Sequence, residues 1–139
     1  MELYDWLLFL HVLSAFIVVG ALVALWALVF ATRPGAPVLQ GTAPMRVGNL
    51  AGPLVGVGLT GTLIFGIWLA LNVDRYDIWD GWIIAALVLW ALGGWAGSRA
   101  GQLFQRDPVG ERQAAIRLQA LNSVAIVVIL ILMIWKPGA

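Results

Sequence analysis

Cysteine is absent from this sequence, and charged side chains are scarce. Its 139 residues include no cysteine, one histidine, eight Lys or Arg and seven Asp or Glu. The absence of cysteine excludes a disulfide framework, a thiolate nucleophile and a cysteine-bound metal. Charged residues make up 11% of the chain, against roughly 25% in soluble domains, which argues against both a soluble globular fold and a disordered chain. A net charge of +1 produces no field that would attract nucleic acid.

Hydrophobic residues make up 62% of the chain, and they form long runs. Four stretches lack any Asp, Glu, Lys or Arg, namely 6–32, 47–73, 81–98 and 118–135. A bilayer core is crossed by roughly 20 apolar helical residues, and backbone groups in lipid must be paired within the segment. The sequence therefore predicts an all-α fold, a four-helix transmembrane bundle, with helices over about 5–32, 47–73, 80–102 and 108–136.

The first stretch differs from a signal peptide. Glu2 and Asp5 precede it, whereas a signal peptide has a basic flank and an apolar run of about 7–15 residues. We interpret the stretch as a retained helix and residues 1–139 as a single integral membrane domain. We expect loop chemistry to end the helices: Pro34 and Gly35 stop the first, Asp80 caps the third, and the Asp107–Pro108 pair starts the fourth.

The distribution of Lys and Arg predicts the orientation. Two connections, between the first and second and between the third and fourth helices, hold Arg33, Arg46, Arg99, Arg106, Arg112 and Arg117. The opposite side holds only Arg75 and Lys136. Because cytoplasmic loops carry an excess of basic residues, we expect an up-down-up-down topology with both termini outside. The expected location is the bacterial cytoplasmic (inner) membrane, as a multi-pass protein.

Glycines recur at spacing four in the second and third expected helices. Residues four apart share a helix face, and a row of glycines lets another backbone approach closely. The two rows have two interpretations: they pack the second and third helices together, or one of them contacts a dimer mate or another subunit. They are Gly48, Gly52 and Gly56, then Gly93, Gly97 and Gly101.

His11 is the only histidine, and it lies inside the first expected helix with Ser14 three residues later. Intramembrane ionisable residues are rare and are functional candidates. One interpretation is a hydrogen bond to a neighbouring helix. A second is a haem or metal ligand, with Met133 or the His11 of a second copy as the other ligand. A third is a proton relay or a substrate contact.

Other polar residues offer little chemistry. We expect Gln119, Asn122 and Ser123, with Ser14, to make hydrogen bonds between helices. No carboxylate lies inside an apolar stretch, which argues against an ion-coupled pump, and no catalytic pair is evident, so we do not expect an enzyme. The segment 74–80 holds three Asp residues, which we interpret as a solvated turn, with weak cation binding as the alternative.

Several short segments resemble an uncharacterised family of small bacterial predicted integral membrane proteins. The resemblance extends distantly to copper-resistance D-type membrane domains, in which Trp-x-Gly-Gly and further histidines follow the first histidine. It implies a four-helix membrane fold, and only His11 carries over as a functional position. The segments are Leu10-His11-Val12-Leu13-Ser14-Ala15, Val18-Val19-Gly20-Ala21, Leu59-Thr60-Gly61, Gly66-Ile67-Trp68-Leu69-Ala70-Leu71 and Trp82-Ile83-Ile84-Ala85-Ala86-Leu87.

These observations lead to one functional expectation with two alternatives. We expect a non-enzymatic subunit or assembly partner of a membrane complex, without a required cofactor. The first alternative is a haem- or metal-binding membrane protein that uses His11. The second is an oligomeric transporter of a small solute or a metal. The expected partners are the lipid bilayer and either further copies of the chain or another membrane subunit, with no nucleic acid.

Overall fold

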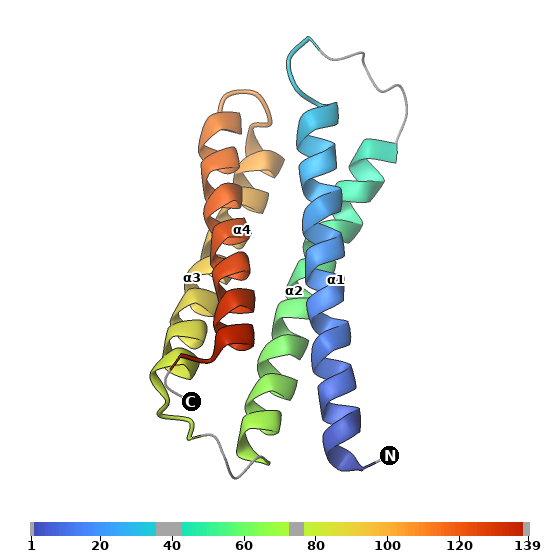
Figure 1. Cartoon of the computed structure of the whole chain (residues 1–139). Coiled ribbons are helices and arrows are strands. Elements are labelled where there is room, and N and C mark those ends of the chain that lie inside the picture. Colours follow the sequence, from blue (N-terminus) through green and yellow to red (C-terminus); the bar gives the residue numbers. More distant parts are fainter. Residues whose placement is uncertain (1, 36–42, 73–76, 138–139) are drawn as a thin grey trace. The chain divides into compact units, whose positions relative to one another are not determined.

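Four long α-helices make up the regular structure of the chain. The computed structural model describes residues 2–35, 43–72 and 77–137 (Figure 1). The helices are α1 (Leu3–Ala31), α2 (Ala43–Leu71), α3 (Gly81–Arg106) and α4 (Arg112–Trp135). Each is long and apolar enough to cross a membrane. The expected all-α class with four spanning helices is thereby confirmed, and the helices indicate a multi-pass membrane protein.

The chain divides into two compact units, Met1–Gly66 and Ile67–Ala139. The first contains α1 and most of α2, and the second contains α3 and α4. Each unit is a helical hairpin and is described by itself below.

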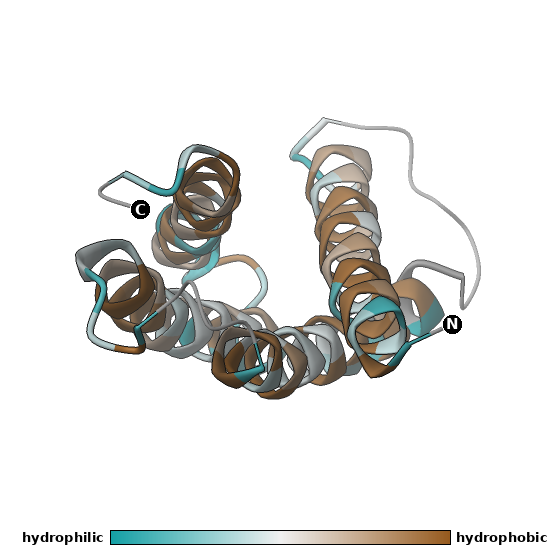
Figure 2. Ribbon diagram, turned by 60° about the horizontal axis from the view of Figure 1, so that its bottom comes forward, coloured by the Kyte–Doolittle hydropathy of each residue, from teal (hydrophilic) through white to brown (hydrophobic). Residues whose placement is uncertain are grey.

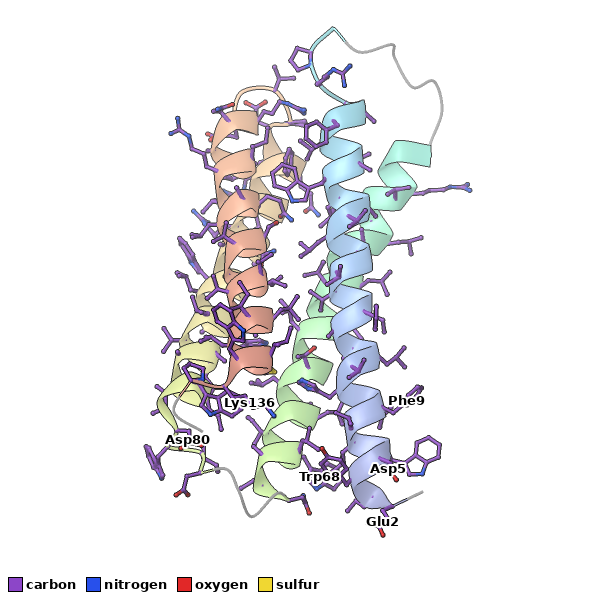
Figure 3. All side chains as sticks on the ribbon, in the orientation of Figure 1. Glu2, Asp5, Phe9, Trp68, Asp80 and Lys136 are labelled. Atoms are coloured by element: carbon purple, nitrogen blue, oxygen red, sulfur yellow. The ribbon has the colours of Figure 1, made fainter. Side chains whose placement is uncertain are left out.

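Local hydrogen bonds set both ends of α1. At its start, the backbone N–H of Glu2 donates to a carboxylate oxygen of Asp5 at 3.0 Å, and the two side chains complete a capping box (Figure 3). At its end, the Thr32 hydroxyl donates to the carbonyl of Leu28. Gly35 follows with φ +80°, a conformation that favours glycine. The helix therefore ends just before the Pro34–Gly35 break that the sequence predicts.

Helices α1 and α2 form an antiparallel pair. The contacts between them join Leu28 to Gly48, Val18 to Gly58, Ser14 to Gly61 and His11 to Gly66. Residue numbers fall along α1 as they rise along α2, which is the pattern of antiparallel helices. The buried positions Leu7, His11, Ser14, Val18 and Ala21 recur at intervals of four and three, a spacing that keeps one face of α1 against its partner.

Helices α3 and α4 pack through small residues. Ala96, Ala100 and Ala115 have no exposed surface, and Ala125 is 2% exposed. Gly93 lies against Ala125 and Asn122, and Gly97 lies against Asn122. Small side chains let the two backbones approach closely, which is how helices associate where lipid removes the hydrophobic drive.

The start of α4 corrects the sequence prediction. The Asp107–Pro108 pair was expected to begin the fourth helix near residue 108, but α4 begins at Arg112 and α3 continues to Arg106. The carboxylate of Asp107 accepts the backbone N–H groups of Val109 and Gly110, at 3.2 and 2.8 Å, and its carbonyl accepts that of Glu111. Asp107 thus closes a hydrogen-bonded turn instead of capping a helix. At the other end of α3, Asp80 does occupy the N-cap position, although its side chain makes no capping bond.

Many large apolar side chains of the helices are exposed, and Figure 2 shows that hydrophobic residues make up much of each helix. Phe16 is 71% exposed, Val23 63%, Val88 61% and Ile134 78%. In water such exposure would be costly, at roughly 25 cal/mol per Å² of apolar surface. In a bilayer the lipid tails solvate these side chains, so the exposure agrees with membrane-spanning helices.

Candidate functional site

His11 makes a polar contact between α1 and α2. Its side chain is 9% exposed, on the face of α1 that packs against α2. It follows the start of the helix at Leu3 by eight residues, a rise of about 12 Å. Polar groups at this depth need protein partners because lipid supplies none.

The backbone of α2 supplies that partner. Nδ1 of His11 lies 3.1 Å from the carbonyl oxygen of Thr62. A carbonyl oxygen only accepts hydrogen bonds, so Nδ1 carries the proton and a neutral ring has its lone pair on Nε2. Among the described residues, Nε2 has no hydrogen-bond partner. An imidazole that donates Nδ1–H to a backbone carbonyl and leaves Nε2 free has the arrangement that metal-ligating histidines adopt.

Glycines of α2 make room for this contact. A Cβ atom on Gly66 would lie 2.9 Å from Cε1 of His11, and one on Gly61 would lie 2.5 Å from Oγ of Ser14. At Gly58 a Cβ would meet the Val18 side chain at 2.6 Å and the Ser14 carbonyl at 3.0 Å. A larger residue at any of these three positions would require a neighbouring atom to shift, and at Gly66 that atom belongs to the His11 ring.

The predicted glycine rows are only partly used in packing. Gly48, Gly93 and Gly97 lie close to a facing helix, whereas no atom lies within 4 Å of the Cβ position at Gly52, Gly56 or Gly101. The row on α2 thus does not pack as a unit within its hairpin, and Gly58, Gly61 and Gly66 pack there instead. The reason is register: the buried positions of α2 include 51, 55 and 58, spaced by four and three, and a row spaced strictly by four drifts off that face. The spacing of 51, 55 and 58 by four and three is visible in the sequence and could have indicated which face of α2 packs.

The hydroxyl groups in the helices bond their own backbone. Ser14 donates to the carbonyl of Leu10 at 2.8 Å, Thr62 to Gly58 at 2.7 Å, and Ser123 to Gln119 at 2.9 Å. For Ser14 this corrects the expectation of a hydrogen bond to another helix, whereas for Ser123 that expectation stays a prediction. A hydroxyl has one proton, and the carbonyl four residues earlier takes it.

Two amides of α4 are buried without full pairing. Gln119 is 4% exposed and Asn122 is 1% exposed. The amide of Asn122 lies over Gly93 and Gly97 of α3, so it does lie at a contact between helices. Nε2 of Gln119 and Oδ1 of Asn122 have no hydrogen-bond partner among the residues that the structure describes.

The remaining predicted positions contribute little to this site. Met133 belongs to α4, in the other unit, so its pairing with His11 stays a prediction. Residues 74–76 of the acidic segment lie outside the described residues, and within 77–80 the backbone N–H of Asp77 donates to the Asp80 carboxylate. No group of three His, Cys, Asp or Glu that could hold a metal ion occurs in residues 2–35, 43–72 and 77–137.

Comparisons with known proteins add no relative. The resemblance to small four-helix membrane proteins and to copper-resistance D-type domains therefore stays a prediction. No protein-family model, no curated protein and no solved structure matches this chain.

Proposed function

We propose that this chain is a small multi-pass membrane protein that binds a haem through Nε2 of His11. The observation that carries the proposal is the hydrogen bond from Nδ1 of His11 to the carbonyl of Thr62, because it orients the ring and places the lone pair on Nε2. A single histidine suffices for one axial position of a haem iron.

The composition of the chain favours a haem over a bare metal ion. The sequence has one histidine and no cysteine, so a zinc or copper ion would lack most of its usual nitrogen and sulfur ligands within one chain. A porphyrin brings four nitrogen ligands of its own, and its apolar ring suits the apolar depth at which His11 lies. The protein then supplies the axial imidazole, its orientation and the surrounding apolar side chains.

An absorbance spectrum tests this proposal. The protein would be purified from haem-replete cells and titrated with haemin in a mild detergent. We expect a Soret band in the natural protein and its loss in His11→Ala. Ser14→Ala is the matched control, because Ser14 lies on the same helix face and its hydroxyl donates to the carbonyl of Leu10. This variant should keep the Soret band. A colourless protein that binds no haemin, or a band that survives His11→Ala, would refute the proposal.

The same spectra identify the second axial ligand. If Met133 occupies that position, Met133→Leu will shift the Soret band without abolishing it. If a second His11 occupies it, Met133→Leu will have no effect and the haem will be found only in a dimer, which native mass spectrometry detects.

A second candidate function is that of a subunit or assembly partner, and the exposed row on α2 favours it. Gly52, Gly56 and Thr60 are spaced by four and exposed, and the two glycines have no neighbour within 4 Å of a Cβ position. Gly56→Leu should then remove a partner chain from the complex seen by native mass spectrometry of gently extracted membranes. Gly20→Leu on α1 is the control, because Gly20 is equally open and exposed. An unchanged complex in Gly56→Leu would exclude this face as the contact.

A further inference from the structure

Four arginines surround the end of the hairpin at which α3 connects to α4. Arg99 and Arg106 lie on α3, and Arg112 and Arg117 lie on α4. Arg99, Arg106 and Arg117 are exposed. The same segment, 99–117, contains only two acidic residues, Asp107 and Glu111, so its net charge is +2. The end of this hairpin is therefore basic.

The carboxylate of Asp107 is directed to the backbone of the connection. It accepts the N–H groups of Val109 and Gly110. Arg99 donates to the side-chain oxygen of Gln102 at 3.2 Å, a neutral partner that leaves its positive charge uncompensated. The charges of the exposed Arg99, Arg106 and Arg117 thus face the medium around the hairpin end.

Helix geometry places these arginines at two depths. Measured from the contact between Gly97 and Asn122, and at 1.5 Å per residue, Arg99 and Arg117 lie about 3 and about 8 Å nearer the hairpin end. Arg106 and Arg112 lie about 14 and about 15 Å from the same contact. The charge-free stretches 81–98 and 118–135 end directly before Arg99 and after Arg117. The inner pair of arginines therefore marks the edge of the apolar span.

The separation of the two depths, about 8 Å along α4 and about 10 Å along α3, is similar to the thickness of the headgroup layer of a membrane. The polar headgroup region adds roughly 5–8 Å on each side of the hydrocarbon core. The inner pair, Arg99 and Arg117, borders the apolar span, so in a bilayer its guanidinium groups reach the headgroup layer. The long side chain of Arg106, about 10 Å further along α3, can reach back to the same layer. All exposed arginines of this hairpin end are thus within reach of lipid headgroups.

We propose that the α3–α4 hairpin end is a binding surface for anionic phospholipid headgroups, carried by Arg99, Arg106 and Arg117. The guanidinium group presents a planar fork of N–H donors that fits phosphate oxygens bidentately. Clustered basic residues at the membrane surface attract anionic lipid, and each further basic residue strengthens the attraction. The surface selects for negatively charged headgroups over zwitterionic ones.

Lipid retention in mixed nanodiscs tests the proposal. The full chain would be placed in nanodiscs of phosphatidylglycerol and phosphatidylcholine, and native mass spectrometry would give the ratio of the two lipids that remain bound. We expect enrichment of phosphatidylglycerol around the natural protein. In the double variant Arg99→Gln/Arg117→Gln the enrichment should fall at least about fivefold. The variant Arg99→Lys/Arg117→Lys keeps the charges and should retain most of the enrichment.

A second double variant removes two positive charges from a part of the chain outside the α3–α4 hairpin. Arg33→Gln/Arg46→Gln alters two exposed arginines outside the α3–α4 unit, of which Arg33 already donates to the carbonyl of Phe30. It should change the enrichment much less. Equal losses in the two glutamine variants, or no loss in Arg99→Gln/Arg117→Gln, would overturn the proposal.

The natural protein provides a measurement that needs no variant. Raising the ionic strength from about 0.1 M to about 1 M shortens the Debye length from about 10 to about 3 Å. The enrichment of phosphatidylglycerol should fall several-fold over this range. An enrichment that does not respond to salt would contradict headgroup binding through exposed arginines, even if the glutamine variants fail to fold.

Discussion

Nδ1 of His11 and the carbonyl oxygen of Thr62 lie 3.1 Å apart and join α1 to the backbone of α2. The two residues are 51 positions apart in the sequence. The contact depends on Gly66, over which Cε1 of the ring lies. A histidine, a backbone carbonyl and a glycine thus meet inside the first hairpin. We make two predictions on this hairpin and two on the α3–α4 hairpin.

The tautomer of His11 is the first prediction. Because Nδ1 must donate to a carbonyl, the neutral ring should carry its proton on Nδ1 and none on Nε2. The nitrogen-15 NMR spectrum of histidine-labelled protein in nanodiscs, without added haem, measures this directly, and a single histidine gives a single pair of signals. A proton found on Nε2 alone would be incompatible with the contact.

The Gly66→Ala variant provides the control for that spectrum. Its Cβ would come within 2.9 Å of Cε1 of His11, so the ring should move away from Thr62. We expect a mixture of tautomers in this variant, and an unchanged spectrum would show that the contact does not hold the ring.

The second prediction concerns the glycines of α2. Gly58→Ala places a methyl group 2.6 Å from the Val18 side chain and 3.0 Å from the Ser14 carbonyl. Overpacking of this kind costs about 1–3 kcal/mol, so the free energy of unfolding in mixed micelles should fall by about that amount. Gly56→Ala, two residues earlier with open space at its Cβ position, should leave the free energy unchanged or raise it slightly. Equal effects would contradict the register of the α1–α2 pair.

The third prediction couples Gly97 to Asn122. A Cβ on Gly97 would lie 2.9 Å from Nδ2 of Asn122, so Gly97→Ala should destabilise the protein, and Asn122→Ala should relieve much of that loss. A double-mutant cycle measured by unfolding should give a coupling free energy of about 0.5–3 kcal/mol. The same cycle with Gly101→Ala, where no atom lies within 4 Å, should give none. Coupling at Gly101 but not at Gly97 would contradict the register in which α4 packs against α3.

The fourth prediction concerns the α3–α4 connection. Asp107→Ala removes the acceptor of two backbone N–H groups, which should lower the free energy of unfolding by about 1 kcal/mol. Glu111→Ala changes the charge equally, but the Glu111 side chain makes no capping bond, so we expect a smaller loss. Chemical denaturation of both variants checks the difference, and a larger loss for Glu111→Ala would argue against the turn.

Much of the fold could be predicted from the sequence, because it depends on local composition. Four long apolar runs predict four helices, and the Pro34–Gly35 break predicts the end of α1 close to Ala31. The start of α4 could not be predicted in the same way. Asp107 has the chemistry both of a helix cap and of a turn, and the choice depends on how α3 and α4 are joined over Val109 and Gly110.

The candidate site shows the same division. His11 stands out in the sequence as the only histidine, within an apolar stretch, but its partner is a backbone carbonyl, which has no signature among side chains. Likewise, glycines at spacing four are conspicuous in the sequence, while the glycines that contact α1 are Gly58, Gly61 and Gly66. Which glycines pack is decided by the register of the whole interface and not by any local pattern.

The sequence by itself thus determined that this is a chain of four apolar helices with one intramembrane histidine, because hydrophobicity and helix breaks are properties of short segments. The tertiary structure alone decided that Nδ1 of His11 is held by Thr62 and that Asn122 lies over Gly93 and Gly97. The physical reason is that lipid offers no hydrogen bonds and no hydrophobic drive between helices, so close backbone approach and the pairing of polar groups set how each hairpin packs.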